Sequence, residues 1–86
     1  MDNKHRQLPL ADENEQALRE KIKRALDKNA LTQVWLINRL RERGLTTDKT
    51  ELSSVFSGTR RGAKISALLR VSDEILTHYE KVMNNG

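Results

Sequence analysis

Residues 31–58 read LTQVWLINRLRERGLTTDKTELSSVFSG, two apolar patterns of helical spacing with a turn between them. The first pattern begins after Thr32, a residue type that caps helix N-termini, and ends at Gly44, a residue type that stops helices. The side chains expected on its buried face are Leu36, Ile37 and Leu40. This segment therefore predicts a helix of about three turns.

The second pattern predicts a shorter helix. Asp48 and Glu51 have the spacing of a capping box at its start, and Ser57-Gly58 suits its end. The apolar residues expected to point inward are Leu52, Val55 and Phe56. The outer face is small and polar, and consists of Lys49, Thr50, Ser53 and Ser54.

Outside residues 31–58, two further amphipathic segments are present. Asp12 and Glu15 repeat the capping-box spacing, which predicts a helix over about 13–28. The last segment predicts either one helix of about 20 residues from Ile65 onward or two helices joined near Ser72. The expected fold is thus a compact all-α bundle of four to five helices.

Residues 1–11 show no periodicity, and Pro9 argues against a helix through them. We expect a flexible N-terminal arm here, followed by a single domain over 12–86. Lys4 and Arg6 make the tip of this arm basic. The tip is interpreted either as a frayed terminus or as an arm that lies in a nucleic-acid groove.

The composition excludes several classes of protein. The chain of 86 residues has no cysteine, so it has neither disulfides nor thiolate chemistry. Its longest strictly apolar run, Val34–Ile37, is too short to span a membrane, and the N-terminus lacks the apolar core of a signal peptide. We expect a cytoplasmic protein that does not interact with membranes.

The positive charge is placed unevenly along the chain, whose formal net charge is +4. Residues 31–46 contain three arginines and one glutamate, and residues 59–64 contain two arginines and one lysine. These basic segments flank the short polar helix, as expected for a helix that enters a groove between two phosphate contacts. The alternative is that these charged side chains only keep the helix ends hydrated and bind no partner.

Residues 31–58 resemble the helix-turn-helix of the lambdoid phage repressor and Cro family (xenobiotic response element family), whose fold is the lambda-repressor-like DNA-binding domain. The resembling features, in chain order, are Thr32-Gln33, the pair Leu36 and Leu40, Gly44-Leu45-Thr46, Leu52-Ser53, Val55 with Gly58, and the basic loop Arg60–Ile65. The first helix of the motif and its turn are longer here than in most members, and the C-terminal helix is long. The resemblance implies a DNA-binding transcriptional regulator.

The resemblance also assigns roles by position. It implies contacts with base edges from Lys49, Thr50 and Ser54. It implies contacts with DNA phosphates from Gln33, Ser53, Arg60, Arg61 and Lys64, and it also implies that Gln33 braces the third helix. Each residue has a simpler interpretation as part of a solvated helix surface.

The end of the chain extends the apolar stripe past the point where a core of this size should close. Tyr79, Val82 and Met83 either complete the core or form a homodimer surface. His5 and His78, the two imidazoles, are far apart in sequence and share no carboxylate cluster, so we expect no metal site, no cofactor, no small-molecule substrate and no enzymatic activity.

The sequence thus predicts a sequence-specific DNA-binding regulator of repressor or Cro type, which inserts its third helix into the major groove of an operator in double-stranded DNA. The resemblance places it in a bacterium or a phage-infected host, or on a mobile element. Two alternatives remain. The same fold could serve as a protein-interaction module that binds another regulator through the last helix or the Trp35 surface, or as an excision accessory factor of a phage or mobile element.

Overall fold

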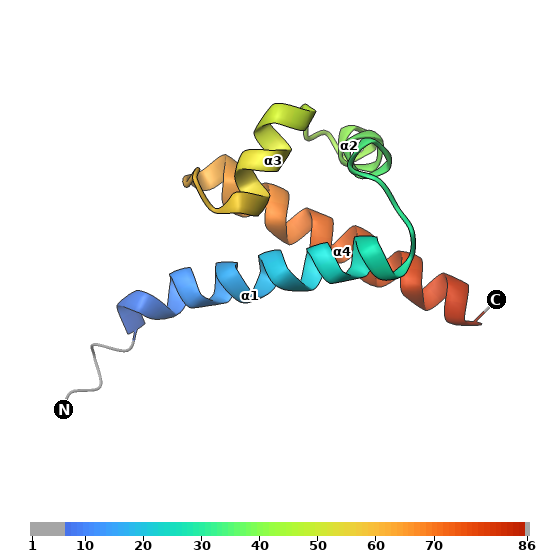
Figure 1. Cartoon of the computed structure of the whole chain (residues 1–86), viewed down its shortest axis with the longest axis horizontal. Helices are drawn as coiled ribbons and strands as arrows, with labels where there is room; N and C mark the ends of the chain where they lie inside the picture. Colours follow the sequence, from blue (N-terminus) through green and yellow to red (C-terminus); the bar gives the residue numbers. More distant parts are fainter. Residues whose placement is uncertain (1–6, 86) are drawn as a thin grey trace.

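The computed structural model describes residues 7–85, which form four helices and no strand. The helices are α1 (Gln7–Lys28), α2 (Gln33–Glu42), α3 (Lys49–Ser57) and α4 (Ala63–Asn85). α1 and α4 cross, and α2 and α3 lie together on one side of this pair (Figure 1). The predicted compact all-α fold is confirmed at this level.

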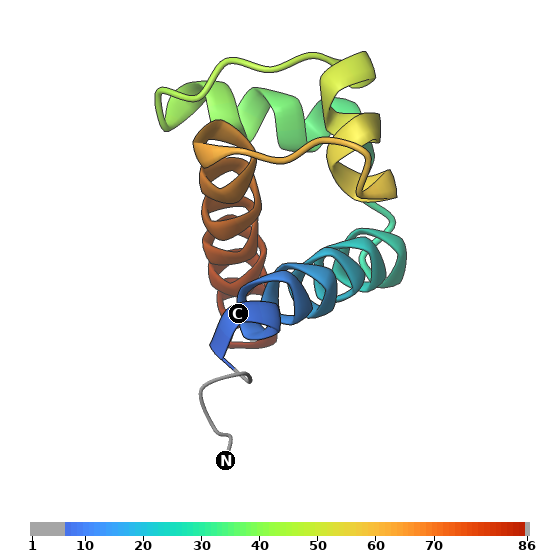
Figure 2. The ribbon, with the colours of Figure 1, turned by 90° about the vertical axis from the view of Figure 1, so that its left-hand side faces the viewer.

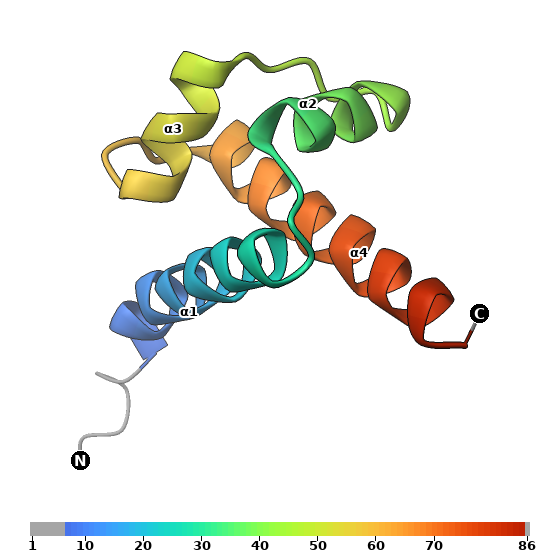
Figure 3. The same cartoon turned by 45° about the vertical axis from the view of Figure 1, so that its right-hand side comes forward.

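The end-on view shows the four helices arranged around a common centre (Figure 2), and their buried apolar side chains form one core there. Every helix contributes to this core, and its most deeply buried side chains include Ile22, Leu36, Leu52 and Leu68, each with no exposed surface. The core lies under α3, so the position of α3 is fixed from its inner side. At the far end, the last turns of α4 extend beyond the other helices (Figure 3).

α1 begins at Gln7, earlier than the predicted start near residue 13. The predicted start is wrong because Pro9 is the third residue of the helix and lies in its first turn. The first four N–H groups of a helix have no partner within it, so the N–H that proline lacks is not missed there. Residues 7–11 of the expected arm are therefore helical, whereas Lys4 and Arg6 lie outside the described residues.

The predicted caps of α2 are present. Thr32 Oγ1 accepts the Trp35 N–H at 3.0 Å at the N-terminus. At the C-terminus, Gly44 has φ +86°, and the Leu45 N–H donates to Leu40 O at 2.9 Å, as in a Schellman motif. Both ends of α2 are thus fixed by local hydrogen bonds.

α4 is one continuous helix, so the alternative of two helices joined near Ser72 is excluded. It is linked to α1 by three groups of polar contacts as well as by the core. Ser66 Oγ donates to Glu15 at 2.5 Å, and Lys21 pairs with Asp73 at 2.8 Å. Near the end of α1, Asn29 Nδ2 donates to a Glu80 carboxylate oxygen at 2.7 Å. The crossing of α1 and α4 is therefore fixed along its length.

Candidate nucleic-acid interface

The exposed N-terminal turn of α3 is the centre of the candidate interface. Asp48 is its N-cap, and its carboxylate accepts the Glu51 N–H at 2.8 Å. The next two residues, Lys49 and Thr50, are exposed to solvent. Leu52 of the same helix is fully buried, so the helix cannot rotate without losing core contacts. The sequence prediction that Lys49 and Thr50 lie on an outer face is confirmed, while their roles toward DNA stay predictions.

A long-range contact connects α3 with the start of α2. Ser53 Oγ lies 3.4 Å from Oε1 of Gln33, twenty residues earlier in the chain. Both were predicted to contact phosphates, and the structure brings them together on one exposed surface. The contact joins the first residue of α2 to the middle of α3, which suits a brace between the two helices.

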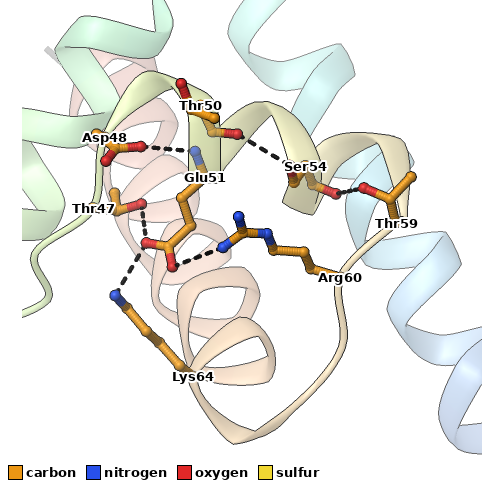
Figure 4. Close-up of polar contacts among 8 residues, drawn as sticks. All are labelled: Thr47, Asp48, Thr50, Glu51, Ser54, Thr59, Arg60 and Lys64. Atoms are coloured by element: carbon orange, nitrogen blue, oxygen red, sulfur yellow. Dashed lines mark hydrogen bonds and ion pairs between the residues drawn. The ribbon is translucent and has the colours of Figure 1, made fainter.

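Ser54 is less available than Lys49 and Thr50. Its side chain is half-buried, and its hydroxyl donates to the backbone carbonyl of Thr50 at 3.1 Å (Figure 4). The carbonyl of Ser54 itself accepts the Thr59 N–H at 3.1 Å, which closes the C-terminal end of α3. The hydroxyl of Ser54 keeps acceptor capacity but has its proton engaged within the helix.

Two predicted phosphate-binding cations converge on a carboxylate of α3. Lys64 Nζ lies 3.0 Å from Glu51 Oε1, and Arg60 Nη1 lies 3.6 Å from Glu51 Oε2 (Figure 4). Thr47 Oγ1 donates to Glu51 Oε1 at 2.7 Å. The hydrogen bond from Thr47, the contact with Lys64 and the charge of Arg60 lower the pKa of Glu51 below its ordinary value, against a smaller opposing effect of burial. These groups line an open cleft of about 350 Å³ beside the first turn of α3.

The loop between α3 and α4 carries the third predicted cation. Gly58 ends α3 with φ +79°, and Gly62 with φ +130° precedes α4. Between them Arg61 is exposed, as is Arg60. The two positive-φ glycines let the chain turn at both ends of the short loop that carries Arg60 and Arg61.

Arg19 on α1 is a cation beside this surface that the sequence analysis did not find. Its guanidinium lies against Gly58, where an added Cβ would stand 3.3 Å from Cζ. The residue is half-buried and hydrogen-bonded to Gln16 at 2.6 Å. Nothing local in sequence links Arg19 to α3, because the contact depends on how α1 packs.

The predicted homodimer surface divides into a packed part and an exposed part. Tyr79 is half-buried and makes an edge-to-face contact with Trp35 of α2, with ring centroids 5.4 Å apart. Val82 and Met83 are 52% and 60% exposed. A cleft of about 300 Å³ lies beside Trp35, Tyr79 and Val82. Leu76 is thus the last buried core residue of α4, Tyr79 packs against Trp35 beyond it, and the apolar stripe continues to Val82 and Met83.

The described residues contain neither a helix long and apolar enough to cross a membrane nor a group of three His, Asp or Glu side chains arranged to hold a metal ion. Comparison of the chain with protein-family models, with curated proteins and with solved structures found no match.

Proposed function

We propose that this protein is a sequence-specific regulator of repressor or Cro type that binds double-stranded DNA with α3 in the major groove. The observation that carries this proposal is the setting of α3: a short polar helix, seated on the core by Leu52, with an exposed first turn at Lys49 and Thr50. Arg60 and Lys64 lie beside that turn. This is the arrangement in which one element reads bases while cations hold the backbone.

Base reading and phosphate binding are assigned to different residues. Lys49 donates to guanine O6 or N7, and Thr50 offers its hydroxyl or its methyl group to a base edge. Arg60, Arg61 and Lys64 bind phosphates, as do Gln33 and Ser53. Because Lys49 and Thr50 provide few bidentate contacts, DNA shape and ordered water contribute much of the specificity.

The test begins with selection of 30-bp duplexes from a randomised pool by the wild-type protein. The selected duplex and a scrambled duplex of the same composition are then titrated at several salt concentrations. We expect the selected duplex to bind about 100-fold tighter or better, with log K falling steeply against log salt. Failure to enrich any sequence, or equal affinity for both duplexes, would refute the proposal.

A second candidate function is favoured by the exposed end of the apolar stripe. Val82 and Met83 lie beyond the last core residue of α4, and Val82 lines the cleft beside Trp35 and Tyr79. Exposed apolar side chains next to an aromatic cleft are typical of a protein contact. They fit either a homodimer, which would double the DNA contacts, or an interaction module that binds another regulator.

One double variant separates DNA binding from the second candidate. Neutralisation of the loop cations, Arg60→Gln with Arg61→Gln, is expected to abolish DNA binding because two phosphate contacts are lost. A protein contact through Val82 and Met83 is expected to survive, since it lies on the far part of α4. Sedimentation of the same variant measures that contact directly.

A further inference from the structure

Glu51 is the point at which the proposed reading helix and its flanking cations are joined. It is the third residue of α3, and its side chain is only 17% exposed. Arg60 on the loop and Lys64 on α4 are about half exposed, at 51% and 53%. One carboxylate thus connects three successive parts of the chain (Figure 4).

The carboxylate is itself held from the inner side. Thr47, which is 8% exposed, donates its hydroxyl to Oε1 at 2.7 Å. The backbone of Glu51 is fixed by its own hydrogen bond to Asp48. Glu51 therefore offers a rigid acceptor to the two cations instead of following their movement.

Both cations keep donors for a second partner. The guanidinium of Arg60 has five N–H donors, and it meets Glu51 through Nη1; the ammonium of Lys64 has three donors. With about half of each side chain exposed, each cation can hold Glu51 and a DNA phosphate together. The contact with Glu51 restricts where that phosphate must lie.

We propose that Glu51 is a positioning residue that sets DNA specificity by holding Arg60 and Lys64 in register with the first turn of α3. This inference rests on the proposed DNA binding. In this arrangement the two cations are already placed for the phosphates that face them when α3 is docked with Lys49 and Thr50 opposite the correct bases. Random DNA has the same backbone but does not hold α3 at that one docked position, so it gains from the charge of the cations more than from their placement.

Three variants separate the effect of where Glu51 holds Arg60 and Lys64 from the effect of its negative charge. Glu51→Asp keeps the negative charge but is one methylene shorter, so it reaches the cations poorly. Glu51→Gln removes both the charge and the ion pairs. The matched control is Glu42→Gln, which removes one carboxylate from an exposed ion pair with Arg39 on α2. Each is titrated with the selected and the scrambled duplex, after circular dichroism and thermal unfolding confirm the fold.

We expect Glu51→Asp to weaken binding of the selected duplex about tenfold and to leave the scrambled duplex unchanged, because two long side chains must then be ordered on binding. Glu51→Gln should bind the scrambled duplex a few-fold tighter, with a loss of the selected-to-scrambled ratio similar to that of Glu51→Asp. Glu42→Gln should keep the wild-type ratio. The ¹⁵N relaxation of the Arg60 Nε–Hε group should show greater mobility in both Glu51 variants.

The outcomes distinguish this inference from the proposed function. If the wild-type protein does not distinguish the duplexes, DNA specificity and the role of Glu51 are refuted together. If it does, but Glu51→Asp keeps the wild-type ratio, only the positioning role is refuted. The positioning role is likewise refuted if Glu51→Gln binds both duplexes more tightly by the same factor, because Glu51 would then act through its charge alone.

Discussion

The guanidinium of Arg19 on α1 lies over Gly58 at the C-terminal end of α3, so that a Cβ added to Gly58 would meet Cζ and Nη2 at 3.3 Å. The contact joins two helices at the point where the basic loop begins. It also puts a positive charge beside the last carbonyl groups of α3, the end of a helix that favours cations.

Replacement of Gly58 by alanine tests this contact. The φ of +79° is unfavourable for any residue with a Cβ, so Gly58→Ala is expected to lower the free energy of unfolding by about 1–2 kcal/mol. Gly44→Ala is the control, because its φ is +86° but nothing lies within 4 Å of the added Cβ. Because the atoms that the added Cβ would meet are the flexible end of the Arg19 side chain, Gly58→Ala should cost about as much as Gly44→Ala in urea unfolding. A much larger cost would contradict this expectation, because it would mean that Arg19 cannot move aside.

Local signals made much of the fold predictable. A cap needs only a side chain and the backbone three residues away, so Thr32 and Asp48 could be recognised from sequence. Glu51 shows where this reasoning stops: its spacing from Asp48 is that of a capping box, yet its carboxylate contacts Thr47, Arg60 and Lys64. Cations in a later segment compete for a carboxylate, and only the packed structure brings them near.

The long-range contacts of the candidate site could be predicted only in part, for the same reason. The resemblance implies that Gln33 braces the third helix, but its contact with Ser53 depends on the angle between α2 and α3. Arg19 belongs to α1 and gives no sign in sequence of approaching Gly58. The start of α1 differs from the expectation because proline disrupts a helix interior but is tolerated in the first turn, where Pro9 lies.

Two serines of α4 are expected to respond oppositely to replacement by alanine. Ser72 is 1% exposed, and its hydroxyl has no hydrogen-bond partner among the described residues. An unsatisfied buried hydroxyl is unfavourable, so Ser72→Ala should raise the free energy of unfolding by up to about 1 kcal/mol. Ser66→Ala removes the bond to Glu15 and should lower it by about 1 kcal/mol. Urea unfolding of both variants checks this, and destabilisation by Ser72→Ala would contradict it.

Glu51 is expected to make the free energy of unfolding depend on pH in the acidic range. Its pKa in the folded chain is below the ordinary 4.5, so folding favours the ionised form. This contribution is complete above pH 4.5 and is lost as the pH falls through the lower pKa of the folded state. The stability difference between wild type and Glu51→Gln should therefore be constant from about pH 6 to 8 and shrink below about pH 4.5.

Urea unfolding at a series of pH values measures this difference, and Thr47→Val provides a second variant. The hydrogen bond from Thr47 is the largest cause of the lowered pKa, so its loss should move the pKa of Glu51 back toward the ordinary value. The Thr47→Val chain should then lose less stability on acidification than wild type. A difference between wild type and Glu51→Gln that grows in acid would refute the lowered pKa.

Base-reading and phosphate-binding residues are expected to differ in their effect on DNA affinity. Lys49→Ala should weaken binding of the selected duplex by about 1–2 kcal/mol more than binding of the scrambled duplex, because a base contact is lost. Arg61→Ala should weaken both duplexes similarly and reduce the slope of log K against log salt by about one. Anisotropy titrations of both variants at several salt concentrations provide the comparison. If Lys49→Ala weakened the two duplexes equally, Lys49 would be a phosphate contact instead.

The exposed end of α4 is expected to hold two copies of the chain together. Met83 is 60% exposed, so Met83→Asp should not destabilise the monomer, yet it should abolish a dimer that buries this side chain. Asn84→Asp is the matched control, because it adds the same charge at the next exposed position of the helix. Sedimentation equilibrium should find a dimer for wild type and for Asn84→Asp, and a monomer for Met83→Asp. A wild-type chain that stays monomeric at every concentration would refute self-association through this stripe and favour another protein as its partner.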